Sequence, residues 1–167
     1  RQYGQRLKLS YASGIQDLGA KYDIMWHPSP AHLIRTGFQS TWHQFTPSAL
    51  VLQDDFINEY VSEIQNIHVL ESGWYAEDEI RIGERIKLNP GFRLSHFVHS
   101  NKHYLKPEPR LSFLYLILPD LSWKSSFASM NQYVHLLSHT GVGLPTDLWI
   151  PTTKNIAPQS TWQVATG

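Results

Sequence analysis

LSFLYLILPDLSWKSSFASMNQYVHLLSHTG, residues 111–141, is the stretch of sequence that decides the predicted fold. Residues 111–118 are apolar at odd and even positions alike, which is typical of a strand in the middle of a sheet, and Pro119 is expected to end it. After Pro119, apolar residues recur at intervals of four, three, four and three: Trp123, Phe127, Met130, Val134 and Leu137. This spacing predicts an amphipathic helix over residues 123–139 that stops at Gly141.

Alternating polar and apolar residues predict further strands on both sides of this stretch. On the N-terminal side they lie at residues 6–11, 22–26, 80–88 and 92–98. Gly83 is expected to mark a bend or bulge, and Asn89-Pro90-Gly91 to form a turn. Two short runs near the other end, residues 148–150 and 162–164, are additional strand candidates.

Two dipeptides carry the signal of a helix start. Ser29-Pro30 and Thr46-Pro47 each combine an N-cap residue with proline at the first helical position. The first predicts a short helix over residues 30–36, and the second predicts a long helix that reaches Ile67. With the helix at 123–139, these elements predict an α+β fold, a mainly antiparallel sheet with two principal helices and one short helix.

Length and composition predict one folded domain over residues 1–167. Hydrophobic residues make up 41% of the chain and charged residues 17%, a balance opposite to that of disordered chains. Because the sequence opens on Arg1 and not on Met, we expect the domain to be a fragment of a longer protein. No window approaches the roughly 18 consecutive apolar residues of a membrane helix, so no membrane span is expected.

The chain is cysteine-free. This excludes disulfides, zinc–thiolate sites, iron–sulfur clusters and thiol nucleophiles. Cysteine-free domains occur in several compartments, so the sequence assigns no localisation.

Charge is balanced overall but divided along the sequence. Fourteen basic and fourteen acidic residues cancel, which removes any global attraction to nucleic acid or anionic lipid. Between Arg35 and Arg81 there is no Lys or Arg but eight acids, whereas bases outnumber acids from Arg81 to Lys124. Two interpretations stay open: two solvated faces that pair with each other, or a dipolar surface that docks a partner or an anion.

The basic segment contains the candidate binding residues. Basic side chains beside aromatic rings hold single-stranded nucleic acids by phosphate contacts and base stacking. Most rings of the segment are expected in the core, Phe92 among them, which leaves an exposed histidine- and lysine-rich cluster. The predicted binding residues are Arg93, His96, His99, Lys102, His103, Tyr104, Lys106 and Arg110.

Signatures of catalysis and metal binding are weak. His135 and His139 have the i, i+4 spacing of metal ligands on a helix, but they fall on the polar face of the predicted helix. No glutamate follows His135, so the H-E-x-x-H pattern of zinc hydrolases is absent. No catalytic residue, cofactor or metal site is therefore predicted, and an enzyme is less expected than a binding domain.

These observations favour a non-catalytic recognition or assembly domain of a larger protein or complex. It would dock a protein partner through a charge-polarised, aromatic-rich surface. The alternative is a module for single-stranded nucleic acid or RNA that uses residues 85–124. A histidine-dependent metal hydrolase is the third hypothesis.

Overall fold

The structure, a computed structural model, describes residues 8–54, 57–61, 66–139 and 146–167. Every element in these residues is a β-strand, so the predicted α+β fold class is wrong. The described part of the chain likewise contains no helix with the length and hydropathy of a membrane span. The strands are β1 (Lys8–Ser29), β2 (His32–Asp54), β3 (Ile57–Val61), β4 (Ile67–Ile82), β5 (Ile86–His99), β6 (Lys102–Leu118), β7 (Leu121–Gln132), β8 (Val134–His139), β9 (Thr146–Pro151) and β10 (Gln159–Thr166).

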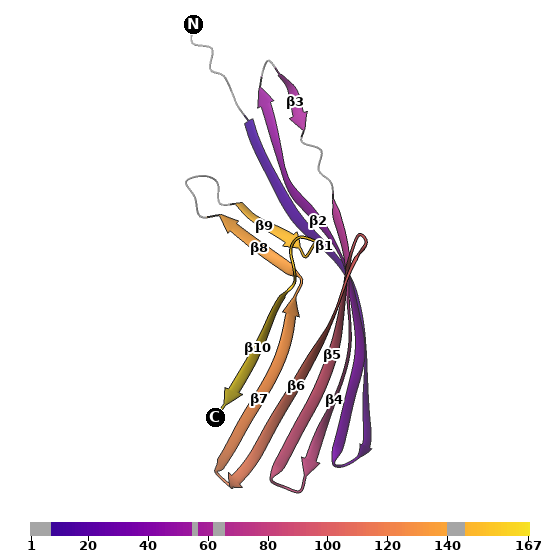
Figure 1. The fold of residues 1–167 in the computed structure, drawn as a ribbon, viewed down its shortest axis with the longest axis vertical. Coiled ribbons are helices and arrows are strands. Elements are labelled where there is room, and N and C mark those ends of the chain that lie inside the picture. Colours follow the sequence, from indigo (N-terminus) through magenta and orange to yellow (C-terminus); the bar gives the residue numbers. More distant parts are fainter. Residues whose placement is uncertain (1–7, 55–56, 62–65, 140–145) are drawn as a thin grey trace.

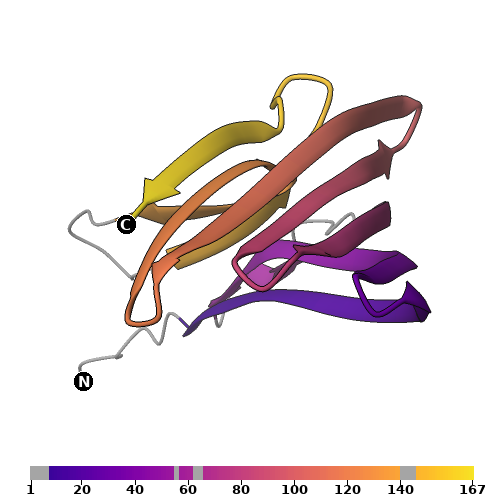
Figure 2. The same ribbon diagram turned by 90° about the horizontal axis from the view of Figure 1, so that it is seen from below.

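Eight of the strands form one antiparallel sheet. Seven follow the order β1-β2-β4-β5-β6-β7-β10, and β3 pairs with the far end of β2 (Figure 1). β1 and β2 have 22 and 23 residues, whereas strands of globular proteins usually have about 3–10. The sheet is strongly curved, and in Figure 2 it bends around the β8–β9 hairpin. We call the side that faces this hairpin the concave face, the opposite side the convex face, and β8–β9 the inner hairpin.

The predicted helix at 123–139 is replaced by β7 and β8. Trp123 and Phe127 are four residues apart, a spacing that also places two side chains on the same face of a strand. Met130 then falls on the other side of β7, so the apolar stripe that predicted a helix does not exist in the structure. Gly141, the predicted helix stop, lies outside the described residues.

The other two helices are also wrong. Ser29 Oγ accepts a hydrogen bond from the Ala31 backbone N–H at 3.3 Å, the contact expected of a helix cap. Here it closes the tight turn from β1 to β2, because Ser side chains support turns in the same way. The predicted long helix from Thr46 falls on the end of β2 and on β3, apart from residues 55–56 and 62–65, which lie outside the described residues.

The predicted turn at Asn89-Pro90-Gly91 lies inside β5. These residues pair with β6 without interruption, whereas pairing with β4 is absent between Gly91 and Leu88. Proline has no N–H to donate, so Pro90 is accommodated at this gap in the ladder. The actual turn from β4 to β5 is at Gly83, whose φ of 63° suits glycine.

Several strand predictions are confirmed. Residues 111–118 belong to β6, which has neighbours on both sides and ends just before Pro119. Residues 148–150 and 162–164 lie in β9 and β10. The two N-terminal predictions, 6–11 and 22–26, are parts of one long strand, β1, apart from residues 6 and 7, which lie outside the described residues.

The buried apolar cluster lies between the concave face and the inner hairpin. Phe45, Val69 and Phe97 from β2, β4 and β5 pack with Tyr133, which precedes β8. The hairpin therefore crosses the sheet from β7 toward β1 and β2, which both contact β9. Aromatic burial of this kind contributes several kcal/mol per ring.

Candidate functional site

The two faces of the sheet differ strongly in charge. Residues of a strand alternate between faces, and cross-strand partners share a face, so the pairing register assigns each side chain. Among charged residues of the main sheet whose side chains the structure describes, only Asp78 lies on the convex face. The concave face carries Asp17, Lys21, Asp23, Arg35, Glu71, Glu77, Glu79, Arg81, Lys87, Arg93, Lys102, Lys106, Glu108, Arg110 and Lys124.

The convex face is apolar and open. Its side chains include Trp74 at 47% and Trp162 at 72% relative exposure, values far from those of core residues. Other exposed apolar residues on this face are Leu18, Tyr22, Ile24, Trp26, Trp42, Leu70, Ile82, Phe92, Leu105, Leu111, Ile117, Trp123, Phe127 and Val164. Exposed apolar surface on this scale marks a region that contacts another protein or a membrane. The expectation that Phe92 is buried is wrong.

The charge division of the sequence becomes a polarity across the concave face. Acids predominate on β1 and β4, and bases predominate on β5, β6 and β7. The halves meet where Arg93 Nη2 of β5 lies 3.8 Å from Glu71 Oε1 of β4. On the acidic side, Arg35 Nη1 of β2 lies 3.1 Å from Glu77 Oε1.

The structure divides the predicted binding residues between the two faces. Six lie on the concave face: Arg93, His99, Lys102, Tyr104, Lys106 and Arg110. His96 and His103 lie on the convex face, so the exposed cluster predicted for this segment is not a single surface. Whether these residues bind anything stays a prediction.

A buried hydrogen-bond chain ties the inner hairpin to the concave face. The Tyr133 hydroxyl lies 2.7 Å from Ser95 Oγ, which lies 2.9 Å from Glu108 Oε1. A carboxylate only accepts, so Ser95 donates its single hydroxyl proton to Glu108, and Tyr133 donates to Ser95. Asn131 donates to the same carboxylate oxygen through its backbone N–H at 3.2 Å and its amide at 3.1 Å. Glu108 is only 4% exposed.

Two further features support this chain of hydrogen bonds. The Tyr133 ring stacks on Phe97 with ring centroids 4.8 Å apart and planes 3° from parallel. Burial raises the pKa of the Tyr133 phenol, so its hydroxyl stays protonated and remains a donor. Arg93 Nε lies 3.8 Å from Glu108 Oε2 and partly compensates the buried negative charge.

The polar contacts continue from Arg93 across the acidic half of the face. Glu71 Oε2 lies 4.0 Å from His43 Nε2, and His43 Nδ1 lies 2.7 Å from Asp17 Oδ1. Polar side chains from β1, β2, β4, β5 and β6 thus meet beneath the inner hairpin. No local motif in the sequence indicated Tyr133, Ser95 or Glu108, because their chemistry depends on contacts between distant strands.

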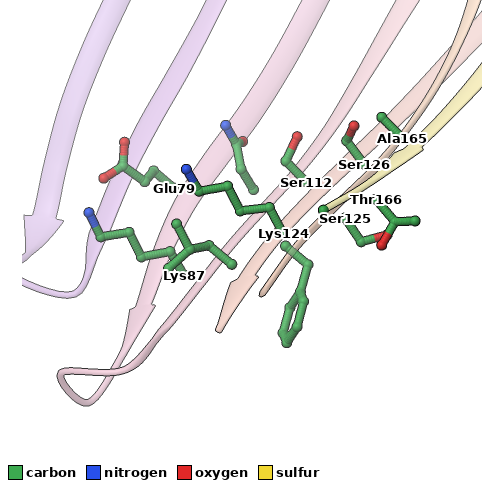
Figure 3. A pocket seen from close by; sticks show the side chains of 12 residues that line it. Glu79, Lys87, Ser112, Lys124, Ser125, Ser126, Ala165 and Thr166 are labelled. Carbon is green, nitrogen blue, oxygen red and sulfur yellow. The ribbon is translucent and has the colours of Figure 1, made fainter. Parts of the chain in front are cut away.

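A second concave region is a hollow of about 470 Å³ near the end of the sheet where β1 turns into β2, β4 into β5 and β6 into β7. We call these three turns the short turns. Figure 3 shows Glu79, Lys87 and Lys124 directed into it from β4, β5 and β7, beside the hydroxyls of Ser112 and Ser126. Glu79 also lies near Arg35 and Arg81, at 3.8 Å and 3.1 Å. Two lysines beside serine hydroxyls make this hollow suited to a hydrated, polar solute.

The histidines predicted to lie on a polar helix face are placed differently. His135 of β8 is buried, and its Nε2 lies 3.1 Å from Oγ1 of Thr152, the residue that follows β9. The side chain of His139 lies outside the described part. Among the described residues, no group of three or more His, Cys, Asp or Glu side chains is arranged to hold a metal ion.

Comparisons with known proteins give a likeness of fold. No family model matches the chain, and no curated protein matches it by sequence. Among solved structures, the chain is similar to part of the ferric citrate transporter FecA in its unliganded form, with a TM-score of 0.53 and 16% sequence identity. The match covers 78% of this chain and 22% of the FecA chain, so this chain spans about a fifth of the transporter's length.

Proposed function

We propose that this chain forms part of the membrane-embedded wall of a transporter. The convex face contacts lipid, and the concave face lines a passage for hydrophilic solutes. The observation that carries the proposal is the segregation of charge: apart from Asp78, the described charged side chains of the main sheet lie on one face and leave the other apolar. Sheets that span membranes have this alternation, apolar outward and polar inward.

Strand length supports the proposal. A membrane-spanning strand needs about 9–11 residues when it is tilted by about 45°. On β2 the convex face carries apolar or small residues from Ile34 to Trp42, and on β6 from Leu105 to Ile117. Both segments are long enough to cross the hydrocarbon region of a bilayer.

The ends of the apolar region also fit a bilayer. Trp26 and Trp123 lie near the short turns, and at the other end Trp42 stacks on His68 with ring centroids 5.2 Å apart. Beyond Trp42 and Leu105, the convex face becomes polar, with His68 and His103. Aromatic residues gather at the two interfaces of a membrane, where their amphipathic rings meet the headgroups.

The one charged residue of the convex face is compatible with this placement. Asp78 Oδ2 lies 2.7 Å from His32 Nδ1, and both residues are close to the short turns. Charges on a lipid-facing surface cost least near the interfaces, and acids cost less than bases. A paired carboxylate near the rim therefore fits a lipid-facing sheet.

Inside the passage, the inner hairpin is the constricting element. It crosses the concave face and is anchored by Tyr133, and the Tyr104 hydroxyl donates to the Thr153 carbonyl at 2.8 Å. Solutes that pass would meet the polar side chains beside this anchor. The likeness to part of a ferric citrate transporter supports the transport role. The solute is determined by this chain's own concave side chains.

Paired cysteine labelling tests the proposal, because the chain has no native cysteine. Leu111 and Ser112 are neighbours on β6 and lie on the convex and concave faces. Leu111→Cys and Ser112→Cys are labelled with an environment-sensitive fluorophore in the protein folded into phosphatidylcholine vesicles. Nitroxide-bearing lipids should quench the label at 111, and aqueous iodide should quench the label at 112.

The matched pair makes the outcome decisive. Equal access of iodide to both labels, with no quenching by lipid nitroxide at 111, would contradict a lipid-facing surface. A label on His103→Cys serves as a depth control, since it should respond to nitroxides at the headgroup and less to those deep in the acyl chains.

Docking of a protein partner is a second proposal, favoured by the polarity of the concave face. The acidic strand β4 beside the basic strands β5, β6 and β7 would orient a partner whose surface has the opposite charge pattern. The nucleic-acid alternative needs aromatic rings and basic side chains on one surface. Phe113 and Trp123 lie on the convex face, whereas Lys102 and Lys106 lie on the concave face. Filter binding to single-stranded DNA and RNA at about 50 mM salt tests it, with no retention expected for a lipid-facing protein.

A further inference from the structure

Two histidines of the convex face point their ring nitrogens at each other. His96 of β5 and His103 of β6 flank the tight turn between these strands, where Ser100 has a φ of 53°. His96 Nε2 and His103 Nδ1 are 3.3 Å apart. The ring centroids are 5.5 Å apart and the planes differ by 13°.

This separation matches a pair of ligands on one metal ion. With Zn–N bonds of about 2.0–2.1 Å and tetrahedral angles, two ligand nitrogens lie about 3.3 Å apart. The strands that carry the rings are held in register by the pairs His96 with Leu105 and Val98 with His103. The two nitrogens are therefore already at the separation that a shared ion requires.

We propose that His96 and His103 form a binding site for a divalent transition-metal ion of the Zn²⁺, Ni²⁺ or Cu²⁺ class. Imidazole nitrogen suits these ions, whereas Ca²⁺ and Mg²⁺ require oxygen ligands. His103 is exposed, so water can complete the coordination shell. The site has two protein ligands. It therefore agrees with the finding that the described residues contain no group of three or more His, Cys, Asp or Glu side chains arranged to hold a metal ion.

The nearest lysine and the third histidine of this hairpin lie on the other face of the sheet. Lys102 and His99 belong to the same turn but lie on the concave face, so neither ring nor ammonium competes for this site. To bind a metal through both facing nitrogens, the ring that donates across the 3.3 Å contact must carry its hydrogen on its other nitrogen instead, so that each imidazole presents a lone pair to the ion. The site depends on the β5–β6 hairpin alone and lies near the end of the convex face that becomes polar.

Titration with Zn²⁺ followed by calorimetry, and with Cu²⁺ followed by electron paramagnetic resonance, tests the site in the purified protein without a histidine tag. His96→Gln and His103→Gln should each lower the affinity of one site at least tenfold at pH 7.5. The Cu²⁺ spectrum of the wild type should show coupling to two nitrogens at this site.

His99→Gln is the matched control, because it lies three residues from His96 on the opposite face and should leave the affinity unchanged. Circular dichroism of each variant establishes that the sheet is intact. If His96→Gln or His103→Gln binds as the wild type does, or if His99→Gln loses affinity equally, the assignment is wrong. The labels at 111 and 112 test the membrane proposal separately, so failure of one leaves the other standing.

Discussion

The contact between Tyr133 and Phe97 should decide whether the inner hairpin stays on the concave face. Both side chains are essentially buried, at 2% and 0% exposure. Truncating a buried aromatic residue to alanine costs about 3–5 kcal/mol, so Tyr133→Ala should lose an amount of this order. Tyr133→Phe keeps the stacked ring and removes only the hydroxyl that donates to Ser95, which should cost about 1 kcal/mol.

Urea unfolding followed by tryptophan fluorescence measures these costs, and a double-mutant cycle isolates the contact. Phe97→Ala combined with Tyr133→Ala should show a coupling of about 0.5–1.5 kcal/mol, the value of an aromatic pair beyond its buried area. Phe92→Ala, on the convex face of the same strand, is the control and should cost less. Additive effects of the two alanine variants, or equal costs for Tyr133→Phe and Tyr133→Ala, would refute the anchoring role of the stacked rings.

Three further changes test other parts of the structure. Glu108→Gln keeps the acceptor oxygen but removes the charge near Arg93, and the free energy of unfolding should fall by about 1–3 kcal/mol in the same urea assay. Gly73→Ala would place its Cβ only 2.8 Å from Arg93 Nε, so its cost should shrink when Arg93→Ala is already present. Leu111→Arg should cost about 2–4 kcal/mol of folding stability in lipid vesicles if that position lies near the bilayer midplane, whereas Ser112→Arg on the concave face should be nearly neutral.

Periodicity alone could not separate helix from strand in residues 123–139. Side chains four residues apart share a face in both structures, and Trp123 and Phe127 therefore fit either. What the local pattern could not show is that Ser125 and Ser126 of β7 pair with Phe113 and Ser112 of β6. The same ambiguity produced the helix predicted after Thr46, whereas residues 111–118 contain no helical spacing and were predicted correctly as a strand.

The divided charge was visible in the sequence, and its meaning depended on the fold. Acids of β4 and bases of β5 are separated along the chain by only one tight turn. Because antiparallel strands pair side by side, this division becomes two halves of one concave face. The candidate site beneath the inner hairpin could not be predicted in this way, since Ser95 and Tyr133 are 38 residues apart.

A continuous apolar segment identifies a membrane helix but not a membrane strand. A strand with one lipid-facing side has an apolar residue only at every second position, and its mean hydropathy stays low. Arg93 lies between Phe92 and Leu94 in such a pattern, and Lys106 between Leu105 and Pro107. The convex face, on which the proposed function rests, therefore leaves no continuous apolar segment in the sequence.

A lipid-facing sheet cannot end in open edges, because each unpaired backbone group in hydrocarbon costs several kcal/mol. Among the described residues, β1 and β10 are the outer strands of the main sheet, and each pairs with a single neighbour. Pairing of β1 with β10 of a second copy would match 22 residues with 8 and leave most of β1 unpaired. Additional strands of matching length satisfy both edges better than copies of this chain alone.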